Sequence, residues 1–109
     1  MTNVEVKVSE FTTLPGGRFI EEGDGSAEEF FKVYISPKLR GPKATILSID
    51  MTGTWGYPPS FTSQLGIYLK KYFGGVEKVI EHVKITIADP ETFDRFWNQL
   101  EDDDEQEAN

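Results

Sequence analysis

Three strand-like segments alternate with three helix-like segments along this chain. In the strand-like segments, β-branched side chains dominate or alternate with polar ones, as in residues 4–8, 44–49 and 83–88. In the helix-like segments, apolar side chains recur at helical spacing, as in residues 26–36, 61–73 and 90–100. This alternation predicts an α/β domain with one mixed or parallel sheet. Residues 18–20 predict a further short strand, so we expect about four strands with three helices packed on them.

Capping residues indicate where the helices begin and end. Ser26 and Glu29 have the spacing of a capping box at the start of the first helix, and Pro37 is expected to end it. Asp89 followed by Pro90 is typical of an N-cap with proline at the first helical position. These signals predict where the first helix begins and ends and where the last helix begins.

The negative charge of the chain is concentrated near its C-terminal end. Residues 101–107 (EDDDEQE) hold six acids and no base. Without them 13 acids remain against 11 bases, so residues 1–100 carry a charge of about −2, whereas the whole chain carries −8. We expect one α/β domain over residues 1–100 and a disordered acidic tail over residues 101–109. No basic face emerges, which argues against nucleic acid as a partner.

The chain lacks the residues on which several kinds of chemistry depend. It has no cysteine and a single histidine, His82, so we expect no metal site. The phosphate-binding motifs GxxxxGK(S/T) and GxGxxG do not occur. No acid, base and nucleophile stand out together, so we expect neither an enzyme nor a bound cofactor. No apolar run is long enough for a membrane span and no signal-peptide pattern is present, so we expect a cytoplasmic protein without a membrane partner.

The connection over residues 50–61 is the strongest candidate for a functional surface. It is longer than the two to six residues usual between a strand and a helix, and it ends at a helix N-terminus, which attracts anions. Asp50 is expected either to accept hydrogen bonds from the following loop or to bind a partner's basic group. Thr52 is a loop hydroxyl beside it. Ser60 is expected to cap the next helix or to lie in its first turn.

Trp55 and Tyr57 are the strongest candidates for binding residues in this loop. Both stand among glycines and prolines, and tryptophan and tyrosine are frequent in binding hot spots. The alternative is that both rings cover the end of the sheet as part of the core. The sequence leaves these two interpretations equally open.

Gly17 and Arg18 are a candidate anion site. In the run Pro-Gly-Gly-Arg, residues 15–18, backbone N–H groups and the guanidinium could together hold an anion. The alternative is a glycine-rich turn that carries a surface arginine.

Three groups of residues resemble the STAS-like family, which is related to the anti-sigma-factor antagonists. These are Gly17-Arg18 with Asp24-Gly25-Ser26 and Glu28-Glu29-Phe30 ahead of Pro37, then Ile49-Asp50 with Gly53 and Ser60-Phe61, and lastly the helix over residues 61–73. In antagonists of that fold, a serine at this loop–helix junction is phosphorylated by a partner kinase. The resemblance therefore implies a regulatory protein-binding module, with Ser60 at the switch position.

The resemblance also implies a partner, namely a histidine-kinase-like ATPase or a related signalling protein. Pro58 and Pro59 stand where those antagonists have an acid before the serine, which favours a binding surface over a phosphorylation site. The alternative function is a module that binds a nucleotide or another phosphate ligand at the same helix N-terminus. We expect a monomer or a weak homodimer.

Overall fold

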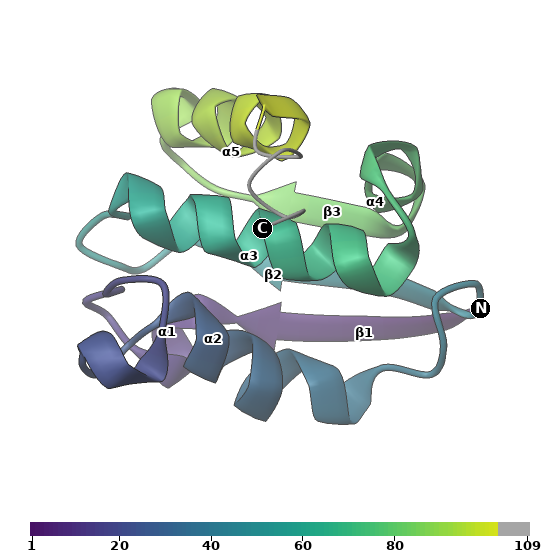
Figure 1. The fold of residues 1–109 in the computed structure, drawn as a ribbon, viewed down its shortest axis with the longest axis horizontal. Coiled ribbons are helices and arrows are strands. Elements are labelled where there is room, and N and C mark those ends of the chain that lie inside the picture. Colours follow the sequence, from purple (N-terminus) through teal and green to yellow (C-terminus); the bar gives the residue numbers. More distant parts are fainter. Residues whose placement is uncertain (103–109) are drawn as a thin grey trace.

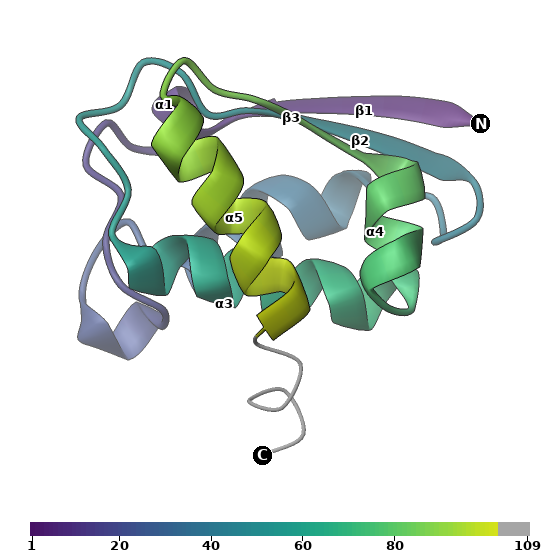
Figure 2. The ribbon, with the colours of Figure 1, turned by 90° about the horizontal axis from the view of Figure 1, so that it is seen from above.

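The computed structural model describes residues 1–102, which form a parallel sheet covered by helices on one face (Figures 1 and 2). The strands are β1 (Thr2–Lys7), β2 (Thr45–Asp50) and β3 (Val83–Thr86). They are hydrogen-bonded in the order β1-β2-β3, all parallel, and the register aligns Val6 with Ile49 and Ile49 with Ile85. The α/β class is therefore confirmed.

The strand order explains why the helices lie on one face. Successive strands are added in one direction, and right-handed crossovers then place every connecting helix on the same side. The connecting and C-terminal helices are α2 (Ala27–Glu29), α3 (Pro59–Phe73), α4 (Val76–His82) and α5 (Pro90–Asp102). Figure 2 shows α3, α4 and α5 below the sheet, and no helix of residues 1–102 lies above it.

Short helical segments complete the first half of the chain. A single turn, α1 (Val8–Phe11), follows β1, and a 3-10 turn, η1 (Ile20–Glu22), precedes α2. The helix that begins as α2 continues through a π-helical stretch, η2 (Phe30–Ile35), and a 3-10 turn, η3 (Ser36–Lys38). Ser26 accepts a hydrogen bond from the Glu29 N–H at 3.1 Å, so the predicted N-cap is confirmed.

The core lies between the sheet and α3. Phe61, Leu65 and Leu69 of α3 are fully buried, as are Leu47 and Ile49 of β2. Burial of these side chains is the main stabilising contribution of the fold. Helix α3 therefore holds its N-terminus, and the loop before it, at a fixed place at one end of the sheet.

Three predictions about the elements were wrong. Residues 18–20 form no strand, so the described sheet has three strands instead of about four. Residues 1–102 form five α-helices instead of three. The N–H groups of Arg18 and Phe19 donate to the Glu22 carboxylate, at 3.0 and 2.9 Å, and that of Ile20 donates to Glu28 at 2.8 Å. These carboxylates take the donors that a neighbouring strand would need. Strand β3 also ends at Thr86, short of the predicted residue 88.

The domain boundary near residue 100 falls inside a helix. Helix α5 runs to Asp102 and so includes the first two residues of the predicted tail. The rest of that tail, residues 103–109, lies outside the described residues. Within residues 1–102, no helix combines the length and apolar character needed to cross a membrane.

Candidate functional site

The carboxyl ends of the three parallel strands meet at one end of the sheet. The loop after β2 lies there, together with the residues after α1 and those between β3 and α5 (Figure 1). In open parallel sheets this end is the usual place for binding sites. All five candidates of the loop over residues 50–61 lie at or near this end.

Asp50 fixes the start of the loop. Its Oδ1 accepts hydrogen bonds from the backbone N–H of Thr52 at 2.9 Å and from the Thr52 hydroxyl at 2.6 Å. The bond from the Thr52 hydroxyl contributes most, followed by the bond from the Thr52 N–H, and both hold the pKa of the Asp50 carboxyl below its ordinary value. The predicted hydrogen bonding within the loop is therefore confirmed for Asp50 and Thr52.

Tyr57 closes the loop from the inside. Its side chain is buried, and its hydroxyl donates to the carbonyl oxygen of Met51 at 2.9 Å. Burial raises the pKa of this phenol to about 12. The ring lies 5.5 Å from that of Phe61, and Arg95 Nη2 donates to the Tyr57 carbonyl oxygen at 2.6 Å. Of the two interpretations for Tyr57, the core one is correct.

Trp55 points into solvent. Its exposed fraction is 84%, the highest among the large hydrophobic residues that are exposed. The backbone beneath it is nevertheless fixed, because the Trp55 N–H donates to the Thr13 carbonyl oxygen at 2.8 Å. Gly53 and Gly56, with φ of 81° and 134°, supply the left-handed conformations on either side. The interpretation of Trp55 as a core residue is therefore wrong.

A second exposed apolar side chain belongs to the segment that holds Trp55. Leu14 follows Thr13, the acceptor of the Trp55 N–H, and is 67% exposed. We define the Trp55 surface as Leu14 together with residues 52–56. Sequence reasoning missed Leu14, because an apolar residue in a turn has no periodicity to mark it. It missed Arg95 as well, because the apolar spacing that predicts a helix does not show which loop carbonyl oxygen an arginine of that helix will bond.

Ser60 lies in the first turn of α3. The N-cap is Pro58, which makes no side-chain capping bond, and Pro59 is the first helical residue. Ser60 is half-buried. Of the two predicted placements, the first-turn placement is confirmed and the capping role is wrong. The hydroxyl stands where a helix dipole favours negative charge.

The Gly17-Arg18 segment already holds a carboxylate of this chain. The two N–H groups that follow Gly17 donate to Glu22, and the Arg18 guanidinium donates to Ser63 Oγ at 3.1 Å and to Gln64 Oε1 at 3.3 Å. An external anion would have to displace Glu22. The segment ties the loop before α2 to the middle of α3.

Asp50 and Asp89 do not border the same hollow. Asp89 lines a pocket of about 110 Å³ with Thr52, Thr54 and Tyr57, whereas Asp50 borders a hollow of about 200 Å³ on the face of the sheet opposite α3. Asp89 caps α5, since it accepts from the Glu91 N–H at 3.1 Å and the Thr92 hydroxyl at 2.7 Å. Within residues 1–102 no group of three or more His, Asp or Glu side chains is placed to hold a metal ion.

Comparisons with models of known protein families, with curated proteins and with solved structures found no match for this chain. The STAS-like resemblance therefore rests on the sequence motifs alone.

Proposed function

We propose that this protein is a non-enzymatic regulatory module that binds another protein through the Trp55 surface. The observation that carries the proposal is an indole that is 84% exposed on a backbone held at both ends. A large apolar side chain gains most from burial in a partner when it is exposed beforehand. A fixed loop also loses little conformational entropy on binding.

The loop contacts support this interpretation step by step. Asp50 and Thr52 fix the first residues of the loop, Tyr57 fixes its last turn, and Thr13 fixes Trp55 itself. None of these contacts requires the indole ring. The ring can therefore be buried by a partner without breaking the hydrogen bonds that hold the loop.

The alternative is a nucleotide or phosphate site at the same end of the sheet, and the pocket there gives it less support. The pocket beside Asp89 measures about 110 Å³, and small-molecule sites usually reach roughly 300–1,000 Å³. The residues that line it include a carboxylate and no lysine or arginine. If a panel of nucleotides raised the melting temperature by several degrees, the ligand alternative would replace the protein-binding proposal.

The STAS-like motifs suggest the class of partner. We take a histidine-kinase-like ATPase in the cytoplasm as the first candidate, with Ser60 beside the contact surface as the position of a switch. A phosphate on Ser60 would lie at the N-terminal turn of α3, where the helix dipole stabilises it.

Affinity capture with three baits tests the proposal. The baits are the native protein, Trp55→Ala, and Val33→Ala as a matched control, because Val33 is also an exposed apolar residue, at 57%. We expect the native protein and the Val33 variant to retain the ATPase and the Trp55 variant to lose it. Equal capture of every protein by all three baits would refute the proposal.

A further inference from the structure

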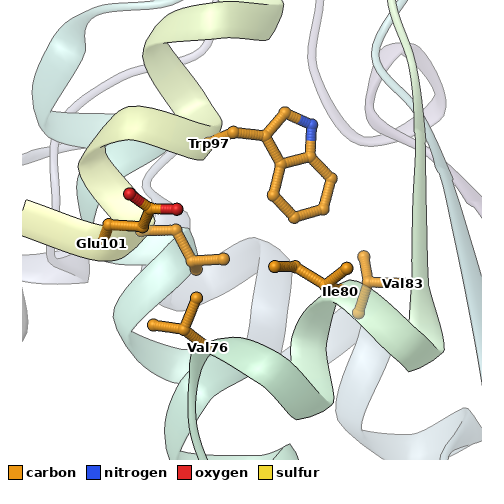
Figure 3. Close-up of a pocket in the computed structure, with 6 residues that line it drawn as sticks. Val76, Ile80, Val83, Trp97 and Glu101 are labelled. Atoms are coloured by element: carbon orange, nitrogen blue, oxygen red, sulfur yellow. The ribbon is translucent and has the colours of Figure 1, made fainter.

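An apolar groove lies between α4 and α5, away from the Trp55 surface. Its lining residues are Val76, Ile80, Val83, Trp97, Leu100 and Glu101. Figure 3 shows Trp97 of α5 and Ile80 of α4 turned toward the space between the two helices, with Glu101 at the rim. In Figure 2 the loop before α3 lies at one end of the molecule and α4 at the other. The groove is thus a second surface, independent of the proposed function.

The groove is open and apolar enough to receive a side chain. Its volume is about 220 Å³, and Ile80 beside it is 57% exposed. Cavities of roughly 150 Å³ admit a benzene ring in other proteins, whereas sites for small-molecule ligands are usually larger than this groove. The size favours one or two apolar side chains of a partner over a free ligand.

The two helices that form the groove carry mostly negative charge, and Glu101 lines the groove itself. Helices α4 and α5 together hold six acids against two lysine or arginine residues. Of the two bases, Lys78 lies 3.5 Å from Glu81, and Arg95 donates to the Tyr57 carbonyl oxygen. An occupant of this groove must therefore tolerate or use the acidic border that these two helices form.

The charge and shape of the groove distinguish four possible occupants, which are a second copy of the chain, residues 103–109, an added strand and a partner helix. A second copy would bring an equally acidic border, and like charges at an interface repel. Residues 103–109 contain one small apolar residue, Ala108, which cannot fill the groove. Strand β3 beside the groove is only four residues long, and short edge strands resist pairing with an added strand. A helix that lies between two helices uses the helix-in-groove mode instead.

We propose that the α4–α5 groove binds a basic amphipathic helix of a partner protein. Apolar side chains of that helix enter beside Trp97 and Ile80, and its lysines or arginines lie over the acidic border. The apolar contact provides most of the affinity, and the charges select a basic partner and speed its association.

Trp97 provides a direct reporter for the test. The chain has two tryptophans, so Trp55→Phe leaves Trp97 as the only one in an otherwise unchanged chain. The probes are two amphipathic peptides of about 14 residues with leucines at the same helical positions, one carrying lysines and one carrying glutamates. We expect saturable change of the Trp97 emission with the lysine peptide only, weakened by added salt.

Two charge-matched variants separate groove binding from general attraction. Ile80→Glu and Val33→Glu each add one negative charge at a position that is 57% exposed. If charge alone mattered, both would bind the lysine peptide slightly better. We expect Ile80→Glu to bind it roughly tenfold more weakly and Val33→Glu to bind it as the parent does.

Several results would overturn this second proposal. They are an unsaturable or absent response to the lysine peptide, equal binding of the glutamate peptide, and unchanged affinity of Ile80→Glu. A dimer of the parent protein in sedimentation that Ile80→Glu dissociates would assign the groove to a second copy instead. None of these results depends on binding at the Trp55 surface. Failure of the groove proposal therefore does not affect the proposed function, which has its own test.

Discussion

The Tyr57 hydroxyl donates a hydrogen bond to the Met51 carbonyl oxygen at 2.9 Å, so the loop after β2 is closed on itself across six residues. Trp55 lies on the outer side of that closure and Tyr57 on the inner side, with exposed fractions of 84% and 8%. Two aromatic residues that are two positions apart thus have opposite roles. Tyr57 stabilises the loop, and Trp55 is left available to a partner.

Tyr57→Phe should lower the free energy of unfolding by about 0.5–2 kcal/mol, because it removes a buried hydrogen bond and leaves the Met51 carbonyl oxygen without its donor. Urea unfolding measures this loss. Tyr34→Phe is the control, since Tyr34 contacts the rings of Phe11 and Phe30 and those contacts survive the change. Equal stability of the native protein and Tyr57→Phe would show that the closure contributes nothing.

Lys70→Met should destabilise the contact between α3 and α5. Lys70 is 2% exposed, and its Nζ donates to the Leu100 carbonyl oxygen at 2.8 Å in the last turns of α5. Loss of a charged donor to a buried carbonyl costs roughly 1–3 kcal/mol. The neighbouring Lys71 is exposed, so Lys71→Met should stay within about 0.5 kcal/mol of the native protein in the same urea experiment.

The stability of the protein should fall as the pH falls below about 4. The pKa of Asp50 is lowered in the folded state, chiefly by the Thr52 hydroxyl, and that of Asp89 is lowered chiefly by the Thr92 hydroxyl. A lowered pKa means that the carboxylate stabilises the fold above its unfolded-state pKa. This contribution is lost as the pH falls through the lower, folded-state pKa.

Asp50→Asn isolates one part of that dependence. It should reduce the free energy of unfolding at pH 7 and make its decrease toward pH 3 shallower than in the native protein, because one titrating group has been removed. Urea midpoints across this pH range measure both effects. An unchanged slope would mean that Asp50 has the same pKa in the folded and unfolded states.

Ser60→Asp should change the affinity for the partner much more than the stability. Ser60 is in the first turn of α3, where an added carboxylate is stabilised by about 0.3–1 kcal/mol. Ser60→Ala provides the uncharged control. If the aspartate variant binds the partner with the affinity of the native protein, Ser60 is no switch.

The sequence predicted the elements whose signals are local. The capping residues Ser26 and Asp89 make the side-chain bonds that their spacing predicts, and alternating valines predicted β1. The strand over residues 18–20 failed because two carboxylates, Glu22 and Glu28, take its backbone donors. No local pattern reveals such a competition.

Burial at the site was harder to predict than the elements themselves. The same composition surrounds Trp55 and Tyr57, and only tertiary contacts decide which ring is buried. His82 is only 7% exposed, with Nδ1 2.8 Å from the Thr45 carbonyl oxygen and its ring stacked on Phe73, and no pattern in the sequence predicted this burial. Contacts between residues about 40 positions apart in the sequence determine these outcomes.

The affinity of the captured partner for Trp55→Ala, measured alongside the free energy of unfolding, tests the central claim most directly. We predict that affinity falls by at least about 2 kcal/mol, as for a binding hot spot. Stability should remain within about 0.5 kcal/mol of the native protein, because the Trp55 side chain is exposed and its backbone contact is kept. Unchanged affinity, or a loss of stability that accounts for the lost binding, would contradict the assignment of Trp55 as a binding residue.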